Sequence, residues 1–233
     1  QHKMGARNVP SFDVNAACSG FIYSLTIAGS MIRSGIYKNV LVIGAEVLSR
    51  ILDMTNRSNC ILFGDGAAAA VVSEVEEGYG MLSTYLGAEG EDNYVLKIPA
   101  GGSKKPNDAE TIANRENFLV MKGPEVFKFA VHALPSATNK ALKIANVKSE
   151  ELKMIFPHQA NVRIIESAAK RIHVPMDKFY MNIQRYGNTS AASVGIALGE
   201  ALEKGMLQKG DLIALTGFGA GLTYGSIVMK WAY

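Results

Sequence analysis

The stretch SFDVNAACSGFIYSLTIAGSMIRSGIYKNVLVIGA (11–45) decides the fold that this sequence predicts. We expect SFDVN (11–15) to form a strand, residues 20–35 to form a helix that ends at a glycine, and NVLVIGA (39–45) to form a buried strand. A strand, a helix and a second strand in this order are typical of an α/β protein, in which helices cover a sheet.

The same order recurs in the second half of the chain. KFYMNI (178–183) predicts a strand, NTSAASVGIALGEALEKG (188–205) a helix and DLIALTG (211–217) another strand. The polar residues near the start of the two helices, Cys18 and Asn188, are equally far from the glycines that end them. The recurrence indicates duplicated α/β halves packed face to face. The small side chains of 188–205 predict that this helix is buried between two sheets.

The remaining segments complete this α/β pattern. We expect strands at 67–75, 154–158 and 223–231, and helices at 124–145 and 161–173. Pro135 should bend or divide the first of these helices. Residues 87–117 are polar and interrupted by Pro and Gly, so they are the best candidate for a linker, with a structured lid as the alternative. The two halves are therefore predicted at 1–117 and 118–233.

Composition limits the class of protein. The chain has 233 residues, of which 48% are hydrophobic, enough to bury a core. The net charge is only +3, whereas a nucleic-acid binder normally carries many more basic than acidic residues, concentrated on one face. The sequence has no apolar run of about 18 residues, and residues 1–15 lack the apolar stretch of a signal peptide. With only two cysteines, it predicts a soluble cytoplasmic protein that inserts in no membrane and binds no nucleic acid.

Cys18 is the first candidate for chemistry. It lies in NAACSGF (15–21), where the predicted strand gives way to a helix. The positive end of a helix dipole favours a thiolate and lowers the pKa of a thiol. The alternative is a buried cysteine that acts as a small apolar side chain. Cys60 precedes an apolar run and is interpreted as a packing residue.

His158 and Asn188 are the second and third candidates. His158 ends a short apolar strand and precedes a helix, and ligands of open α/β sheets bind at strand ends. Considered without the repeat, Asn188 is interpreted as a helix N-cap. Its place in the repeat matches that of Cys18, however, and this makes it a candidate active-site residue. The glycines of FGAGLTYGS (218–226) would allow backbone N–H groups to approach a substrate oxygen. No group of residues has the spacing of metal ligands.

Five segments, spread in this order over most of the chain, resemble β-ketoacyl-[acyl-carrier-protein] synthase III, the initiating condensing enzyme of bacterial fatty-acid synthesis. They are NAACSGF (15–21), GDGAAAAV (64–71), PHQANVR (157–163), YGNTSAAS (186–193) and GFGAGLTYGS (217–226). The resemblance implies a thiolase-like fold, a layered α-β-α-β-α sandwich of duplicated halves. The Cys, His, Asn set also fits plant polyketide synthases, but PHQAN and GNTSAAS favour the initiating synthases.

The resemblance implies a decarboxylating Claisen condensation. A short acyl-CoA primer would join malonyl-acyl carrier protein to give 3-oxoacyl-acyl carrier protein, CoA and CO2. Cys18 would carry the acyl group as a thioester, and His158 and Asn188 would donate hydrogen bonds to the malonyl thioester carbonyl. The backbone N–H groups of Cys18 and Ala220 would form the oxyanion hole. The family needs no cofactor or metal and acts as a homodimer on acyl-CoA and acyl carrier protein.

The resemblance assigns further positions. Phe218 would shield the site and favour decarboxylation, and Phe63 would form a wall of the acyl pocket. Asn161 would contact the pantetheine arm of CoA, and Arg57 the adenine end. Four basic residues of predicted helices could attract an acidic carrier protein, with ordinary solvated helix charges as the alternative reading. They are Lys128, Arg163, Lys170 and Arg171, of which Arg163 is favoured because its helix starts just after His158.

The sequence also departs from the family. Ala220 stands where Gly is frequent, and Tyr224 where Trp is common. The strands and helices that the family has before SFDVN are missing, so Gln1 is interpreted as a cut in a larger enzyme. Two other functions stay open. One is acyl transfer to a hydroxyl or amine, as in relatives from secondary metabolism, and the other is a non-catalytic truncated form.

Overall fold

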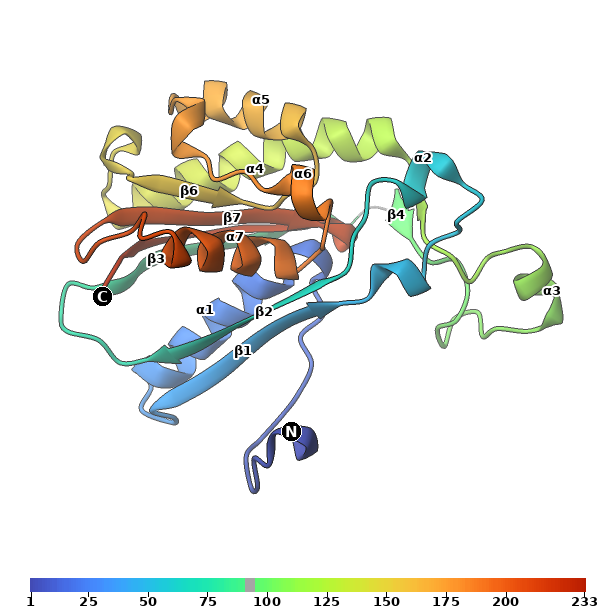
Figure 1. Ribbon diagram of the computed structural model, residues 1–233, viewed down its shortest axis with the longest axis horizontal. Coiled ribbons are helices and arrows are strands. Elements are labelled where there is room, and N and C mark those ends of the chain that lie inside the picture. Colours follow the sequence, from blue (N-terminus) through green and yellow to red (C-terminus); the bar gives the residue numbers. More distant parts are fainter. Residues whose placement is uncertain (91–94) are drawn as a thin grey trace.

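Alternating layers of helices and strands build the part of the chain that the computed structural model describes, residues 1–90 and 95–233 (Figure 1). One outer helical layer covers a sheet of four strands. A second helical layer separates that sheet from a sheet of two strands. The layer helices are α1 (Gly20–Arg33), α4 (Gly123–Ala145), α5 (Val162–Ile172) and α7 (Ala192–Glu203), with α4 and α5 outside and α1 and α7 between the sheets.

The larger sheet has the order β3-β8-β7-β6. Strands β6 and β7 are parallel, whereas β8 is antiparallel to both β7 and β3. Apolar side chains fill both faces of this sheet, and Phe156, Ile213 and Ile227 are completely buried. The strands are β3 (Gly80–Ala88), β6 (Met154–Pro157), β7 (Leu212–Gly219) and β8 (Thr223–Lys230). Because β3 pairs with β8, residues before 118 contribute to this sheet, and the division of the chain into 1–117 and 118–233 stays a prediction.

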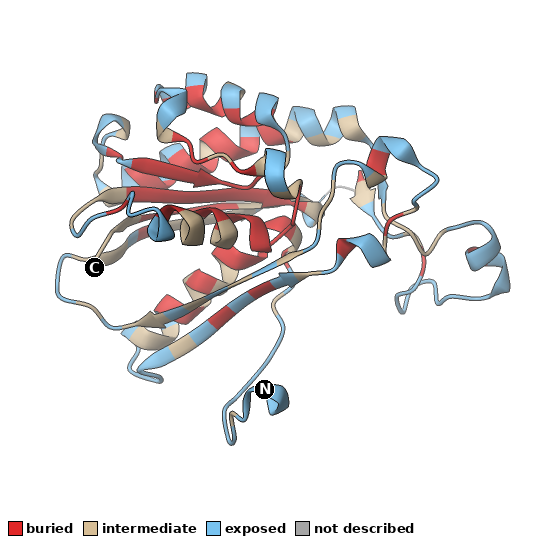
Figure 2. Cartoon of the chain, in the orientation of Figure 1, coloured by how far each residue is buried: buried red, intermediate tan, exposed pale blue. Residues whose placement is uncertain are grey.

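The smaller sheet pairs β1 (Asn39–Glu46) with β2 (Gly66–Ser73) in antiparallel register. Its inner face packs on α1 and α7, but its outer face is open (Figure 2). Leu41 and Ile43 are 42% and 53% exposed on that face, and Val71, opposite Leu41, is 70% exposed. The prediction of a buried strand at 39–45 is therefore wrong for one face, because no described element covers it.

Helix α7 is buried between the sheets, as its small residues predict. Ala192, Val194 and Ala197 are completely buried. A Cβ at Gly195 would lie 2.6 Å from Cβ of Ala68 on β2, so a larger residue there would push the helix and the sheet apart. Among the described residues, no helix is both long and apolar enough to cross a membrane.

Two predicted strands are wrong. Residues 11–15 form no strand, and Phe12 is 63% exposed, because no described strand lies beside this segment to pair with it. Residues 178–183 form one bridge, between Phe179 and Ile155. The side chain of Gln159 replaces the ladder beyond that bridge, since its Oε1 accepts hydrogen bonds from the N–H groups of Asn182 and Ile183.

Other expectations hold with small changes. Helix α4 continues through Pro135 as one helix, so the proline does not divide it. Residues 87–117 contain short elements, and an ion pair between Arg115 and Asp53 ties this region to the segment between β1 and β2. Residues 91–94 lie outside the described part. The short elements of the chain are α2 (Arg57–Cys60), α3 (Ala109–Ala113), α6 (Ile183–Tyr186), β4 (Leu96–Lys97) and β5 (Val120–Met121).

Candidate active site

The three predicted catalytic residues line one cavity of about 280 Å³. Cys18 comes from the turn before α1, His158 from the end of β6 and Asn188 from the segment before α7. The cavity therefore lies where both halves of the repeat meet the four-stranded sheet. Predicted residues that also line it are Phe63, Asn161 and Phe218, and its apolar wall includes Leu96, Met121 and Phe127.

Cys18 sits in a tight 3-10 turn, Ala17–Ser19, immediately before α1. Ala17 adopts the left-handed conformation at φ 46°, which sharpens this turn. Cys18 is only 7% exposed. Its burial raises the pKa of the thiol to about 11, although a hydrogen bond with the Ser190 side chain partly lowers this pKa. The expected lowering of this pKa by the helix N-terminus is wrong, because desolvation of the thiolate outweighs it.

The raised pKa predicts how Cys18 reacts with iodoacetamide. In a Cys60→Ala chain, where Cys18 is the remaining thiol, the alkylation rate should rise about tenfold per pH unit from pH 7 to pH 10, because only the thiolate reacts. Mass spectrometry at each pH measures the rate. A rate that levels off below pH 8 would show a lowered pKa instead.

His158 is held at the end of β6 by its backbone and by its ring. Its N–H donates to the carbonyl of Thr216 at 2.8 Å, which continues the pairing of β6 with β7. Its Nδ1 lies 2.7 Å from Oγ of Ser193, and the edge of its ring meets Phe218 at a centroid distance of 5.3 Å. Burial lowers the pKa of His158 to about 3, so the imidazole is neutral at physiological pH.

Asn188 is fixed by hydrogen bonds to the turn around Phe63. Its N–H donates to the carbonyl of Leu62 and its carbonyl accepts from the N–H of Gly64, both at 2.9 Å. Its Oδ1 accepts from the N–H of Ser190 at 2.8 Å, which leaves the Nδ2 amide as the donor group at the cavity. The N-cap reading does not apply, since α7 begins four positions later at Ala192.

The end of β7 and the turn that follows it pass directly beside Cys18. A Cβ at Gly219 would lie 2.6 Å from the backbone nitrogen of Cys18, so only glycine fits there. The Thr223 hydroxyl donates to the carbonyl of Ala16 at 2.8 Å and fastens this segment to the turn that carries the thiol. Ala220 follows Gly219 and is half-buried, and it is not among the residues that line the cavity. The contacts of Gly219 and Thr223 were not predicted, although both residues lie in the segment GFGAGLTYGS (217–226).

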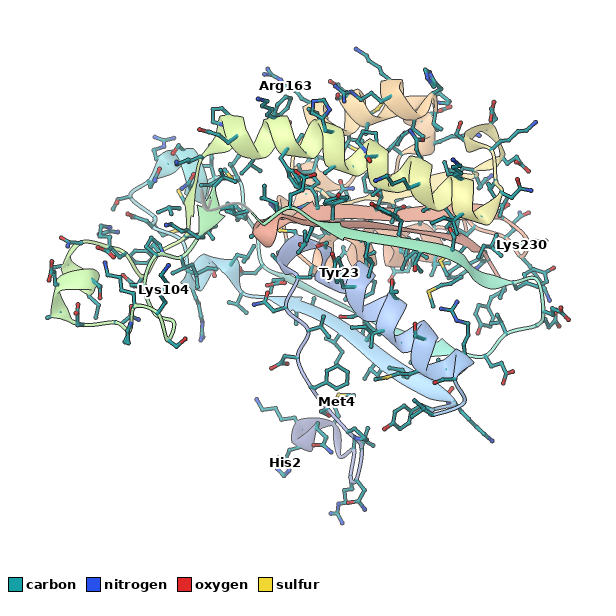
Figure 3. The ribbon with its side chains drawn as sticks, turned by 180° about the vertical axis from the view of Figure 1, so that it is seen from behind. His2, Met4, Tyr23, Lys104, Arg163 and Lys230 are labelled. Carbon is teal, nitrogen blue, oxygen red and sulfur yellow. The ribbon has the colours of Figure 1, made fainter. Side chains whose placement is uncertain are left out.

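Of the predicted CoA and carrier-protein residues, only Asn161 lines the cavity. That side chain caps α5, with Oδ1 accepting from the N–H of Arg163 at 2.9 Å. Arg57 is exposed at the first position of α2. The four basic residues are exposed on the outer helical layer, where Figure 3 labels Arg163. Lys128 lies on α4 and the other three, Arg163, Lys170 and Arg171, on α5.

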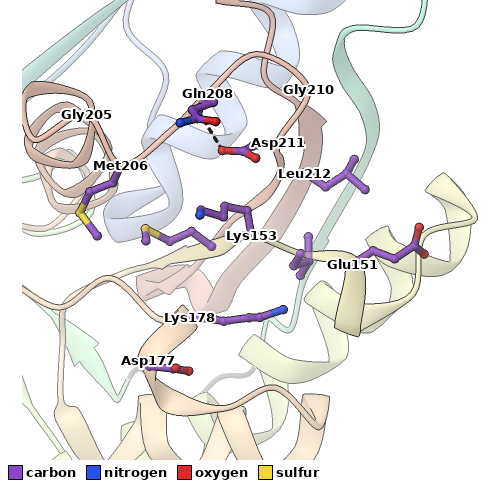
Figure 4. A pocket seen from close by; sticks show the side chains of 12 residues that line it. Glu151, Lys153, Asp177, Lys178, Gly205, Met206, Gln208, Gly210, Asp211 and Leu212 are labelled. Atoms are coloured by element: carbon purple, nitrogen blue, oxygen red, sulfur yellow. Dashed lines mark hydrogen bonds between the residues drawn. The ribbon is translucent and has the colours of Figure 1, made fainter.

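A second hollow, of about 760 Å³, lies away from these residues (Figure 4). Side chains of both charges line it, among them Lys153, Lys178, Asp177 and Asp211. It contains none of the predicted site residues. Within the described part of the chain, no group of three or more His, Cys, Asp or Glu residues could hold a metal ion.

The layered duplicated fold and a buried Cys, His, Asn set at its centre define the class of thiolase-like condensing enzymes. Two family models match: "3-Oxoacyl-[acyl-carrier-protein (ACP)] synthase III" at residues 12–90 and its C-terminal domain at 142–231. The chain therefore belongs to the β-ketoacyl-[acyl-carrier-protein] synthase III family, as its motifs predict.

Similar proteins agree with this assignment. The chain is 67% identical over its whole length to β-ketoacyl-[acyl-carrier-protein] synthase III of Fusobacterium nucleatum, and 52% identical to that of Caldanaerobacter subterraneus; it covers 71% and 70% of these proteins. The crystal structure of 3-oxoacyl-[acyl-carrier-protein] synthase III from Aquifex aeolicus matches with a TM-score of 0.88 and 45% identity, covering 99% of this chain and 70% of that one. These matches confirm the thiolase-like fold.

Proposed function

We propose that the chain catalyses the decarboxylating condensation of a short acyl-CoA with malonyl-acyl carrier protein, the first condensation of fatty-acid synthesis. The observation that carries this proposal is the meeting of Cys18, His158 and Asn188 at one cavity, in a chain of this family. The two substrates and the sulfur of Cys18 supply all the reacting groups, so the proposed reaction needs no further cofactor.

Acyl transfer to Cys18 is the first step. The sulfur of Cys18 attacks the thioester carbonyl of acyl-CoA, the bond to the CoA sulfur breaks, and the thiol proton ends on that sulfur. The N–H groups of Cys18 and Ala220 stabilise the oxyanion of the tetrahedral intermediate. The close approach of Gly219 to Cys18 supports this pairing, because it brings the two backbone segments together. The product thioester is neutral, so it suits the buried position that disfavours a thiolate.

Decarboxylation and condensation form the second step. The bond between the malonyl carboxylate and the methylene carbon breaks, CO2 leaves, and negative charge moves to the thioester oxygen. Nε2–H of His158 and Nδ2–H of Asn188 donate to that oxygen. The carbanion attacks the acyl thioester, and the sulfur of Cys18 leaves and takes up a proton from solvent. The raised pKa of Cys18 favours return to the thiol.

Release of CO2 tests the proposal against simple acyl transfer. With acetyl-CoA and malonyl-acyl carrier protein labelled at the free carboxylate, the chain should release one labelled CO2 for each 3-oxoacyl product. Acyl transfer to a hydroxyl or amine releases none, and a non-catalytic form would also leave Cys18 unacylated. If the chain acylates Cys18 but releases no labelled CO2, the proposed condensation is wrong, and acyl transfer to a hydroxyl or amine is favoured instead.

In this proposal the residues around Cys18, His158 and Asn188 shield the site and bind the substrates. Phe218 shields the site, supported by its edge contact with His158, and Phe63 forms a wall of the acyl pocket beside Asn188. Asn161 contacts the pantetheine arm, and Arg57 the adenine end of CoA. A homodimer, expected from the family resemblance, and a cytoplasmic location, expected from the composition, stay predictions.

The basic residues of α4 and α5 predict how the carrier protein docks. Arg163→Glu should raise the KM for malonyl-acyl carrier protein about three- to tenfold at low salt, because it reverses one charge of the surface that attracts an acidic partner. The KM for malonyl-CoA should stay unchanged, and the difference should shrink at high salt. Lys38→Glu, at an exposed position before β1, is the matched control. Equal effects of the two substitutions would contradict a specific docking surface.

A further inference from the structure

The side chain of Gln159 links the end of β6 to the segment that leads to Asn188. Gln159 follows His158 in the chain and is only 1% exposed. Its Nε2 donates to the carbonyls of Pro157 at 2.9 Å and Tyr180 at 3.0 Å. Neither the family motifs nor the proposed reaction gives this side chain a task.

The oxygen of the same amide holds the start of α6. Oε1 of Gln159 accepts from the N–H groups of Asn182 at 3.1 Å and Ile183 at 3.2 Å, which make no other hydrogen bond among the described residues. These partners can only donate, whereas the two carbonyls can only accept, so the orientation of the amide is fixed. A buried amide with every donor and acceptor position in use holds its surroundings rigidly.

Close packing passes a movement of α6 on to Asn188. The helix ends at Tyr186, two residues before Asn188, and a Cβ at Gly64 would clash with the carbonyl oxygen of Tyr186. Gly64 also donates its N–H to the carbonyl of Asn188 at 2.9 Å. His158 stays with β6, because its N–H is bonded to β7. A shift of α6 would therefore move Asn188 relative to His158.

The relative position of these two side chains matters for the proposed second step. Nε2–H of His158 and Nδ2–H of Asn188 donate there to one thioester oxygen, and a hydrogen bond weakens steeply outside a narrow range of distance and angle. A misplacement of about 1 Å at a reacting group costs a factor on the order of 100 in rate.

We infer that Gln159 is a positioning residue whose side-chain amide clamps α6 to the end of β6 and thereby sets the distance between Asn188 and His158. Gln159 is not among the residues that line the cavity, so it acts through Asn188 rather than on the reacting atoms. The inference rests on the proposed function for its purpose, but the clamp itself can be observed without any reaction.

Hydrogen exchange tests the clamp directly. In the full chain with Gln159→Met, the N–H groups of Asn182 and Ile183 should exchange at least about tenfold faster, measured by NMR, because their acceptor is lost. The N–H of His158 should keep its rate. Gln184→Met is the matched control, because it makes the same change at an exposed position of the same helix. It should leave all three rates unchanged.

Rates of the two half-reactions separate positioning from a general loss of structure. Gln159→Met should lower CO2 release from malonyl-acyl carrier protein at least about tenfold, and Cys18 should still acylate to completion. In an Asn188→Ala chain the same substitution should change CO2 release by less than about twofold, because the donor that it displaces is already missing. Melting temperatures show whether each variant has folded.

Gln159→Glu is a milder second variant, because its oxygen still accepts from the start of α6 but it cannot donate to both carbonyls. It should lower CO2 release by a smaller factor than methionine, again only where Asn188 is present. Unchanged exchange of the two N–H groups in the Gln159→Met chain would overturn the clamp. An equal loss of CO2 release with and without the Asn188 amide would overturn the positioning role. If exchange accelerates as expected but the unsubstituted chain releases no CO2, the proposed function fails while the clamp stands.

Discussion

Replacing Cys18 by alanine should abolish the transfer of an acetyl group from acetyl-CoA to the chain and lower 3-oxoacyl formation by a factor on the order of 10⁴ or more. The reason is that the proposed reaction passes through a thioester on this one sulfur. The other cysteine cannot replace it, because Cys60 does not line the cavity and its thiol points to the carbonyl of Met54 at 3.8 Å. Intact-mass measurement after mixing with acetyl-CoA gives the result directly.

The matched control for this substitution is Cys60→Ala, which should gain one acetyl group like the unsubstituted chain. Both variants remove one thiol from the same protein, so a difference between them reports position rather than composition. Acetylation of the Cys18→Ala chain at another residue, with 3-oxoacyl formation retained, would contradict the assignment of the nucleophile.

The elements that the sequence predicted well are those set by local patterns. The helices at 20–35 and 188–205 end within two residues of the prediction, because glycine and apolar spacing mark their ends. The predictions of strands at 11–15 and 178–183 are wrong. A strand forms only where a second strand lies beside it, and the residues of the segment itself do not determine whether one does. The same holds for 39–45, whose alternating exposure follows from what covers each face.

The candidate site divides in the same way. That Cys18, His158 and Asn188 meet at one cavity could be expected from motifs, since each stands in a recognisable segment, and their catalytic roles stay a proposal. The pKa of Cys18 could not, because the helix terminus is visible in the sequence while the depth of burial is a property of the whole fold. Ser193 escaped notice for a related reason: its contact with His158 joins the start of α7 to the end of β6, two elements distant in the chain.

Asn188→Asp should slow decarboxylation of malonyl-acyl carrier protein by roughly 10²–10³-fold or more, the cost of losing one oxyanion donor. Aspartate keeps an oxygen where Oδ1 of Asn188 accepts from the N–H of Ser190, so the turn before α7 is retained. In place of the amide it presents a second carboxylate oxygen, which repels the charge that develops as CO2 leaves. The rate of labelled CO2 release measures the effect.

The decisive comparison is between the two half-reactions of the same variant. The oxyanion of acyl transfer is proposed to lie at the N–H groups of Cys18 and Ala220, so Asn188→Asp should still acylate Cys18 to completion, measured by intact mass. A general loss of structure would impair both steps, whereas loss of one donor impairs only the second. If CO2 release stayed within about threefold of the unsubstituted chain, Asn188 would not stabilise that charge, and the amide would serve only the turn.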